Sequence, residues 1–350
     1  MINLKSRADN LNFTNANFSS KNYECNNSSH AVLSSSEELK SKNHKKVAII
    51  LGYYDGHKFI KDQLLSIFKQ THKALHVFLC DDRSKKPFNL DSLKLNPEQL
   101  SKLSFATRSK NIGLTKNFIH PLDDIPREFE YYAFSDQDDI WHANKLEKAI
   151  SRLEKISSDI PSLYFARTEI VDADAENTLY NSTLFCKTPS FANALVQSIG
   201  GGNTMVFNRA AKNLIKNSFL DVDVISYDWW IYQIISGVGG YIFYDPEPCL
   251  KYRQHDFNLI GANNSLDARL VRLRKLLQGH FRKWCDMNLK NLLENKHLLT
   301  ISNQRVLEDF AKARQSTFFK RFYFFKRSGI HRQTLFGNLG LIIAIIFNKV

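Results

Sequence analysis

Three aspartates stand close together in the segment 134–141 (FSDQDDIW), directly after an apolar run. If Asp136, Asp138 and Asp139 were all ionised they would repel one another, so their clustering costs free energy unless a cation offsets it. A hard divalent cation with oxygen ligands is the natural compensation. Alternate side chains of an extended segment share one side, so one carboxylate would bind the metal while its neighbour reaches a ribose or a water. The alternative is an acidic loop that caps a helix beginning near residue 143.

A second acidic pair, Asp81 and Asp82, follows the apolar run 75–79. A carboxylate there can accept a hydrogen bond from the imide N–H of a uracil or thymine; a solvated turn or a helix N-cap is the alternative. At the end of the first apolar run, Gly52 permits close approach of a ligand, and Tyr54 offers an aromatic face for stacking on a base. By itself, Tyr-Asp-Gly is typical of an ordinary turn.

Both acidic clusters stand at the ends of apolar runs that alternate with helical patterns. Five runs predict strands, at 47–51, 75–79, 103–107, 131–134 and 162–166. Helical patterns are expected at 59–68, within 114–122 and at 145–156. This alternation predicts an α/β, Rossmann-like fold with a mostly parallel sheet flanked by helices. Such sheets bind ligands beyond the carboxyl ends of their strands, where the two clusters lie.

The composition is that of a globular protein. With 43% hydrophobic and 12% aromatic residues among 350, a fully disordered chain is excluded. We expect residues 1–44 to be a disordered polar leader, because they lack the apolar segment of a signal peptide. No apolar stretch reaches the roughly 18–20 residues that span a bilayer. The five cysteines contain no CxxC pair, which argues against a zinc site or a disulfide framework and favours the cytoplasm.

The positive charge is concentrated near the C-terminus. Residues 266–350 carry 17 Lys/Arg and 5 Asp/Glu, a net charge of +12 out of +13. A basic nucleic-acid-binding protein, one alternative function, would spread its charge over the folded body, so we expect no nucleic-acid partner. Interleaved aromatic and basic residues at 318–327 and the apolar run 335–347 instead favour peripheral binding to an anionic membrane. The alternative is a C-terminal helix packed on the catalytic domain.

Seven stretches occur in an order that resembles the family 2 inverting glycosyltransferases of GT-A fold. They are Tyr54-Asp55-Gly56, 63–71 (QLLSIFKQT), Cys80-Asp81-Asp82, Asn111-Ile112-Gly113, 135–141 (SDQDDIW), Tyr227-Asp228-Trp229-Trp230 and 252–261 (YRQHDFNLIG). The resemblance covers roughly residues 45–265 and is closest to bacterial rhamnosyltransferases of surface polysaccharide synthesis. It implies a GT-A domain over 45–265, followed by a helical, basic and apolar tail over 266–350.

The resemblance implies how the donor is bound. Tyr54 would pack on the nucleobase and Asp82 would accept from its N3–H, while Asn111 and Asn117 would shape the nucleotide pocket. Asp136 would face the ribose or the metal. Two departures, Arg83 in place of the usual Gly and Tyr53-Tyr54-Asp55 in place of Thr-Tyr-Asn, fall at the base-binding end. The resemblance therefore specifies the reaction class more closely than the base.

The resemblance also implies the catalytic residues. Asp138 would be the principal ligand of Mg²⁺ or Mn²⁺, and His255 a further metal or phosphate contact. Asp228 would be the general base that activates the acceptor hydroxyl. Four residues would face the diphosphate or the acceptor: Arg253, Gly202, Trp229 and Trp230. The alternatives are an N-cap role for Asp228, an ordinary loop position for His255 and a core position for the tryptophans.

Together these features predict transfer of a sugar, with rhamnose as one candidate, from a dTDP- or UDP-sugar to a saccharide or lipid-linked saccharide. The product would be an O-antigen or capsule polysaccharide, made by a cytoplasmic enzyme bound peripherally to the inner face of the plasma membrane. A nucleotidyltransferase on a similar sheet is the alternative enzyme class. It is disfavoured because no Gly-rich phosphate loop with a basic residue opens the fold.

Overall fold

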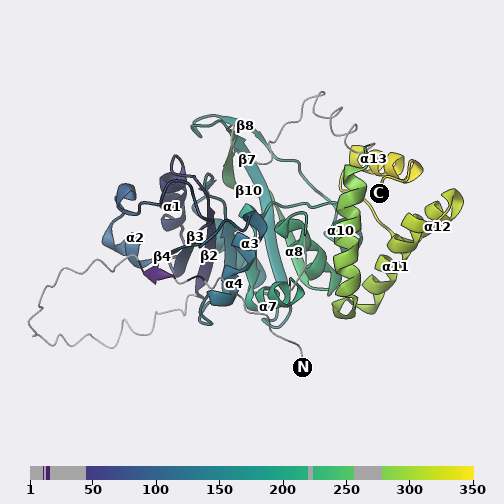
Figure 1. The fold of residues 1–350 in the computed structure, drawn as a ribbon, viewed down its shortest axis with the longest axis horizontal. Helices are drawn as coiled ribbons and strands as arrows, with labels where there is room; N and C mark the ends of the chain where they lie inside the picture. The colour runs from purple at the N-terminus through teal and green to yellow at the C-terminus, as the bar shows by residue number, and fades with distance from the viewer. Residues whose placement is uncertain (1–10, 12, 16–44, 220–223, 256–277) are drawn as a thin grey trace, which may run out of the picture.

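The computed structural model describes residues 11, 13–15, 45–219, 224–255 and 278–350. Its centre is a ten-stranded sheet with the order β1-β4-β3-β2-β5-β9-β7-β10-β6, in which β8 pairs with β7 (Figure 1). The strands are β1 (Thr14–Asn15), β2 (Val47–Tyr53), β3 (Leu75–Asp81), β4 (Leu103–Thr107), β5 (Tyr131–Ser135), β6 (Ile140–Trp141), β7 (Ser162–Val171), β8 (Thr178–Asn181), β9 (Val206–Asn208) and β10 (Tyr241–Arg253).

β4, β3, β2 and β5 form one parallel group, β7 and β10 form a second parallel pair, and all five strands expected from the sequence are present. β2 is buried along its whole length because both faces of the sheet are covered. Its residues alternate between two hydrophobic cores: Ala48 and Ile50 pack in one, and Ile49 and Leu51 in the other. A strand that is buried on both faces therefore appears in the sequence as a continuous apolar run, and not as an alternation of apolar and polar residues.

Helices cover both faces of the sheet, as expected for the α/β class. α1 (Ile60–Phe68) and α5 (Lys145–Leu153) pack on one face. The other face carries α3 (Leu114–Ile119), α4 (Pro121–Asp124), α6 (Phe191–Ala194), α7 (Arg209–Ser218) and α8 (Tyr227–Gly237). The remaining short elements before residue 220 are α2 (Pro97–Ser101), η2 (Asp91–Leu93) and η3 (Gly202–Thr204). The expected helices at 59–68, 114–122 and 145–156 are confirmed, although α5 ends at Leu153.

Part of the expected disordered leader is ordered. Leu11 is buried, and Thr14 and Asn15 form β1, which pairs antiparallel with β4 through Phe105 and Ser104. β1 thereby covers the edge of β4, whose backbone groups would otherwise lack a strand partner on that side. The prediction of disorder is therefore wrong for this short segment. The remaining residues of 1–44 lie outside the described part of the chain.

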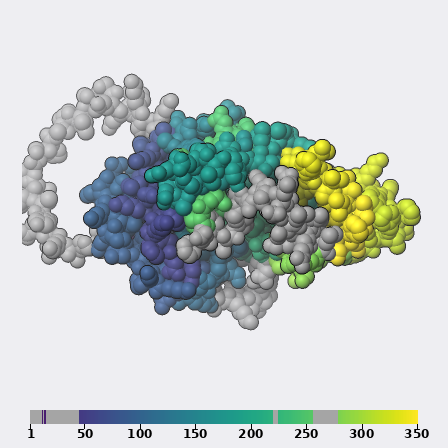
Figure 2. Space-filling view, turned by 90° about the horizontal axis from the view of Figure 1, so that it is seen from above, coloured from purple at the N-terminus to yellow at the C-terminus, as the bar shows by residue number. Residues whose placement is uncertain are grey.

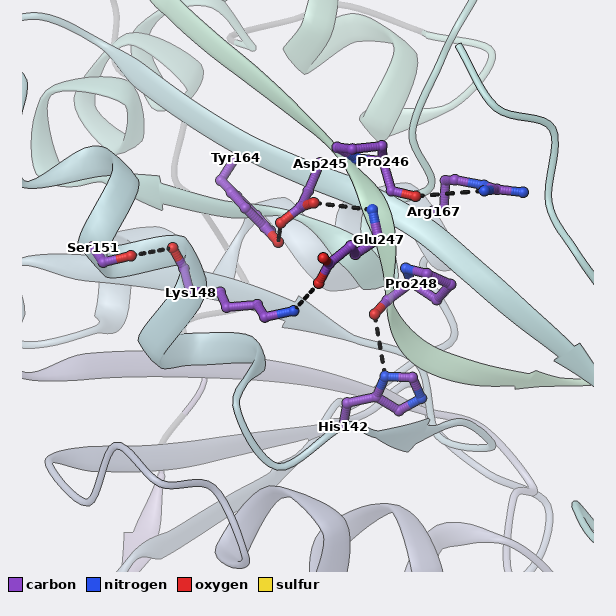
Figure 3. Close-up of polar contacts among 9 residues, drawn as sticks. All are labelled: His142, Lys148, Ser151, Tyr164, Arg167, Asp245, Pro246, Glu247 and Pro248. Atoms are coloured by element: carbon purple, nitrogen blue, oxygen red, sulfur yellow. Dashed lines mark hydrogen bonds and ion pairs between the residues drawn. The ribbon is translucent and has the colours of Figure 1, made fainter. Parts of the chain in front are cut away.

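A bulge in β10 redirects the strand across the sheet. The register between β10 and β7 shifts on both sides of Pro248. Figure 3 shows polar side chains that hold this bulge: the Tyr164 hydroxyl donates to Asp245 (2.7 Å), Lys148 pairs with Glu247, and a ring nitrogen of His142 contacts the Pro248 carbonyl (3.1 Å). Beyond the bulge β10 pairs antiparallel with β6. Its end therefore lies beside the acidic loop between β5 and β6.

The C-terminal region is helical, as expected. Its elements are α10 (His280–Glu294), η4 (Lys296–Leu298), α11 (Ile301–Gln315), α12 (Phe318–Ser328) and α13 (Leu335–Ile346). These helices form one end of the molecule (Figure 2). Leu292, Phe310, Phe325 and Ile345 are buried in the same core as the α8 face of the sheet. No helix in the described residues is both long enough and apolar enough to cross a bilayer.

Because the C-terminal helices share this core, truncating Phe310 should destabilise the whole domain. Phe310→Ala should lower the free energy of unfolding by about 3–5 kcal/mol, since a fully buried aromatic ring is lost. Urea unfolding followed by circular dichroism measures this change. Ile301→Ala, at a residue that is 72% exposed on the same helix, is the control and should change stability by less than about 0.5 kcal/mol. Two separate unfolding transitions, with only one of them shifted, would show that the tail folds independently.

Candidate active site

The polar site lies where three neighbouring parallel strands end. β3, β2 and β5 are adjacent, so their carboxyl ends meet at one edge of the sheet. Asp82 follows β3, Tyr54 follows β2, and Asp136 follows β5. The Asp82 N–H donates to the carbonyl of Tyr53 (2.9 Å). The predicted donor-binding residues are thus brought together by strand order alone.

Asp82 is held by the loop that carries Asn111. The Asp82 carboxylate accepts hydrogen bonds from the backbone N–H groups of Ile112 (2.8 Å) and Gly113 (2.9 Å). The side-chain amide of Asn111 donates to the backbone carbonyl of Asp82 (3.0 Å). Burial raises the pKa of Asp82, whereas these N–H groups act in the opposite direction. Gly113 has a φ of +84°, which favours glycine. The Asp82 carboxylate therefore also fixes the 111–113 loop, a role that the sequence analysis did not predict.

Asn117, which was predicted to shape the nucleotide pocket, is held by two side-chain hydrogen bonds. Its buried side-chain amide donates to the Cys80 carbonyl (2.8 Å) and accepts from the Nε of Arg108 (2.8 Å). These bonds connect α3 to the end of β3. Tyr54, by contrast, is 40% exposed, so its ring remains accessible for stacking.

Gln137, in the middle of the acidic motif, ties the acidic loop to the end of β2. Its side chain accepts from the Tyr54 N–H (2.8 Å) and donates to the Tyr54 carbonyl (3.1 Å), as a neighbouring strand would. A Cβ added to Gly56 would lie 2.2 Å from the Gln137 Oε1, so a larger residue there would displace the Gln137 amide from the Tyr54 backbone. The sequence analysis singled out the aspartates and missed this residue between them.

The acidic loop is electrostatically strained, as its composition predicts. Burial, with Asp138 and Asp228 nearby, raises the pKa of Asp136 to about 7. Burial, with Asp136 and Asp138 nearby, also raises the pKa of Asp139 well above its usual range. One carboxylate oxygen of Asp139 accepts from Asn203 (2.7 Å), while the other has no hydrogen-bond partner among the described residues. A nearby positive charge would stabilise all of these carboxylates in their ionised form.

Asp138 and His255, the two predicted metal ligands, lie next to each other. The His255 Nε2 lies 2.9 Å from the Asp138 Oδ2, and the imidazole stacks on Phe59 (4.6 Å between ring centroids). A carboxylate and an imidazole are a suitable pair of ligands for Mn²⁺, and the carboxylate suits Mg²⁺. Within the described ranges, no group of three or more His, Cys, Asp or Glu side chains is arranged to hold a metal. Asp138 and His255 therefore fit as two ligands of a divalent cation. The other ligands of that cation would come from groups other than these two side chains.

Asp228 lies in the first turn of α8 rather than at its cap. Ser226 occupies the N-cap position, so the N-cap alternative for Asp228 is wrong. The Asp228 carboxylate accepts from the Trp229 N–H (2.7 Å) and also from the backbone N–H of Gly202. Burial raises the pKa of Asp228, while these hydrogen bonds lower it. Asp228 is close enough to Asp136 to raise the pKa of that group.

The predicted diphosphate and acceptor residues differ in what they touch. Arg253 is buried, donates to Asp62 (2.8 Å) and to the Ala173 carbonyl (3.0 Å), and is therefore engaged by protein atoms. Trp229 and Trp230 are both in the core, and the Trp229 indole donates to the Ala194 carbonyl (2.7 Å). The prediction that they face the acceptor is wrong, because α8 is covered on nearly all sides. Residues 256–261 of the last motif lie outside the described residues.

A series of hydrogen bonds links the predicted residues into one site. Asp82 bonds to Tyr53, Gln137 bonds to Tyr54, Asn203 bonds to Asp139, and Gly202 bonds to Asp228. These bonds connect the ends of β3, β2 and β5 with one another, and the acidic loop with the start of α8.

Comparisons with known proteins point to one class of enzyme. The family model described as "Glycosyl transferase family 2" matches residues 48–213. The dTDP-rhamnosyl transferase RfbG of Shigella flexneri is 29% identical over 247 residues, which cover 66% of this chain and 80% of the relative. The UDP-Glc:alpha-D-GlcNAc-diphosphoundecaprenol beta-1,3-glucosyltransferase WfgD of Escherichia coli is 25% identical over 213 residues, 59% of this chain and 76% of the relative.

The fold is also similar to that of a solved structure. The crystal structure of S. aureus TarS 1-349 in complex with UDP-GlcNAc superposes with a TM-score of 0.50 at 13% identity, covering 81% of this chain and 79% of that chain. The sheet and its flanking helices are therefore those of the GT-A fold. These matches favour sugar transfer over the nucleotidyltransferase and nucleic-acid-binding alternatives. Residues 48–213 therefore form a glycosyl transferase family 2 domain, and the chain is a nucleotide-sugar-dependent glycosyltransferase.

Proposed function

We propose that this enzyme transfers rhamnose, or a related hexose, from a dTDP- or UDP-sugar to a hydroxyl of a saccharide or lipid-linked saccharide, with inversion. The observation that supports the proposal is that Asp82 and the acidic loop follow neighbouring strands of the sheet, while Asp228 lies close enough to Asp136 to raise its pKa. The rhamnosyl donor is supported by the name of the Shigella relative, and the lipid-linked acceptor by that of the E. coli relative.

The donor nucleotide would lie across the ends of β3, β2 and β5. Tyr54 offers its exposed ring to the base, and Asp82 has carboxylate lone pairs beyond those used by the 111–113 loop. Asp136 would lie between the base end and the catalytic end, where it would suit a ribose hydroxyl. In this arrangement Asn111 and Asn117 shape the pocket by holding its walls rather than by touching the ligand.

Asp138 and His255 would hold Mg²⁺ or Mn²⁺ beside the diphosphate. The bound cation would neutralise the negative charge that the leaving diphosphate develops. Two observations support this position for the cation. Asp138 and His255 lie side by side, with the His255 ring stacked on Phe59, and the neighbouring carboxylates have raised pKa values. Without a cation these carboxylates repel one another, which favours metal binding to this loop.

Asp228 would act as the general base. As the acceptor oxygen forms its bond to the anomeric carbon, the bond from that carbon to the diphosphate breaks, and the hydroxyl proton passes to the Asp228 carboxylate. A single displacement from the opposite face inverts the anomeric configuration. The raised pKa of Asp228 makes it a better proton acceptor than an exposed aspartate.

We further propose that the C-terminal helices bind the cytoplasmic surface of the plasma membrane. α13 contains no charged residue, and one of its faces carries exposed apolar side chains: Leu335 (82%), Leu339 (54%), Ile342 (47%) and Ile346 (41%). This spacing forms a stripe along one side of the helix. α12 adds exposed Phe319 and basic residues, and a groove between α11 and α12 is lined by Lys312 and Lys320. Such a surface complements an anionic lipid bilayer.

Asp138→Ala should abolish sugar transfer without unfolding the protein. We expect kcat to fall by at least about 10²–10³-fold, because the cation would lose its main ligand. Nucleotide diphosphate release from dTDP-rhamnose and UDP-hexoses measures turnover, and calorimetry of Mn²⁺ binding with the nucleotide diphosphate present gives a second readout. Asp159→Ala, at an exposed residue after α5, is the matched control. Full activity of Asp138→Ala, or of the wild type in excess EDTA, would rule out the metal role.

Asp228→Asn should retain donor binding but lose transfer, because the amide cannot accept the proton. In the wild type, kcat should decline as the pH falls through the pKa of Asp228, and that limb should lie above the usual aspartate range because the pKa is raised. A pH profile of kcat, together with nucleotide titration of the variant, tests both statements. If Asp228→Asn transferred sugar at the wild-type rate, another residue would be the base.

Replacing Leu339 and Ile342 of α13 with glutamate should release the enzyme from anionic membranes. Each change removes an apolar side chain from the interface and adds a charge, so binding should fall at least about tenfold. Sedimentation with phosphatidylglycerol vesicles measures binding, and phosphatidylcholine vesicles test the contribution of lipid charge. Leu179→Glu, at an exposed apolar residue of β8, is the control. Equal sedimentation of the α13 variant and the wild type would contradict the proposal.

A further inference from the structure

The short turn η3 contacts both halves of the catalytic site. The Asn203 side-chain amide donates to the Asp139 carboxylate (2.7 Å), beside the proposed metal ligand. The preceding residue, Gly202, donates its backbone N–H to Asp228, the proposed base. The acidic loop and α8 are far apart in the sequence, and these two adjacent residues join them. Asn203 itself is only 5% exposed.

A buried lysine also holds this turn in place. The Nζ of Lys145, the first residue of α5, donates to the Asn203 backbone carbonyl (2.5 Å) and lies 3.3 Å from the centroid of the Trp141 ring. Lys145 is completely buried, and its ammonium group donates to a carbonyl oxygen rather than to a carboxylate. Burying an unpaired cation costs free energy. Near Asp136 and Asp139, however, the positive charge of Lys145 offsets part of the local negative charge.

The turn has little freedom to adjust. A Cβ on Gly202 would lie 2.0 Å from the Tyr227 hydroxyl, so the backbone of the turn rests directly against the start of α8. The Thr204 hydroxyl donates back to the Gly201 carbonyl (2.8 Å), which closes the turn on itself. A displacement of Asn203 would therefore be transmitted to the N–H that contacts Asp228.

We propose that Asn203 and Lys145 are positioning residues for the transfer step, and this rests on the function proposed above. They hold Asp228 at a fixed place relative to the acidic loop, and hence relative to the donor diphosphate. Displacement at the anomeric carbon requires the acceptor oxygen, the carbon and the leaving oxygen to be aligned. A misplacement of about 1 Å costs on the order of 10²-fold in rate. Neither residue needs to touch the donor or the acceptor for this effect.

The test compares Asn203→Ala and Lys145→Met with the wild type. Active sites are first counted by calorimetric titration with the nucleotide diphosphate and Mn²⁺, and kcat is then expressed per nucleotide-binding site. We expect kcat to fall roughly 10- to 100-fold in both variants, while the Kd of the nucleotide diphosphate stays within about threefold, because the base-binding residues are unchanged. This separation distinguishes positioning from a loss of folded enzyme.

Asn208→Ala is the matched control. Asn208 is also a buried asparagine, but it caps α7 and binds the Ser162 N–H, away from the acidic loop. Its loss should lower the unfolding midpoint and leave the rate per site unchanged. If Asn203→Ala does not fold, Lys145→Met carries the test, since its side chain keeps nearly the same length.

Three outcomes are distinguishable. Wild-type kcat per site in both variants would overturn the inference. An equal loss of kcat and of nucleotide affinity would also overturn it, because it would place the two residues in the donor site. If the wild type itself transfers no sugar from any dTDP- or UDP-sugar, the proposed function fails instead.

Discussion

The repulsion among carboxylates gathered at one sheet edge is the constraint on which the rest of the site depends. Asp136, Asp138 and Asp139 follow β5 within four residues, and Asp228 approaches from α8. Burial makes their ionisation costly, as the raised pKa values of Asp136 and Asp139 show. The surrounding protein offsets this cost with an amide and a backbone N–H that donate to Asp139 and Asp228, and with the nearby positive charge of Lys145. A cation bound at this loop would reduce the remaining repulsion.

The fold supports this arrangement because the residues of the site lie at the ends of different strands and helices. Strand order brings the ends of β3, β2 and β5 together, and the bulge in β10 brings the end of that strand alongside β6. His255 thereby reaches Asp138 although the two are distant in the sequence. The stiffness of the sheet, covered by helices on both faces, is what allows such contacts to hold at hydrogen-bond distance.

Much of this could be predicted from the sequence, for identifiable reasons. Continuous apolar runs such as 47–51 specify buried parallel strands, and the topology of such sheets then specifies where Asp82 and Asp136 must lie. Long-range contacts could not be predicted in this way. Nothing in the local sequence of Lys145 distinguishes it from the surface lysines of an amphipathic helix, and the burial of Trp229 depends on the helices packed around α8.

The C-terminal helices show why one apolar pattern allows two interpretations. Apolar residues of α13 divide between a face that packs in the domain core, with Leu341 and Ile345, and a face that points outward, with Leu335 and Leu339. Composition records how many apolar residues there are, but not how they divide between the two faces. The periodicity of a helix determines that division only once its packing partner is known.

The close contact between Gly56 and Gln137 has a consequence for how this enzyme can diverge. A side chain at position 56 would occupy the space that the Gln137 amide now fills, and a shorter residue at 137 would leave the Tyr54 backbone groups without those two hydrogen bonds. Changes at the two positions are therefore expected to be inherited together. Among descendants of this chain, the pair should covary even though one residue follows the first strand of the domain and the other lies in its acidic loop.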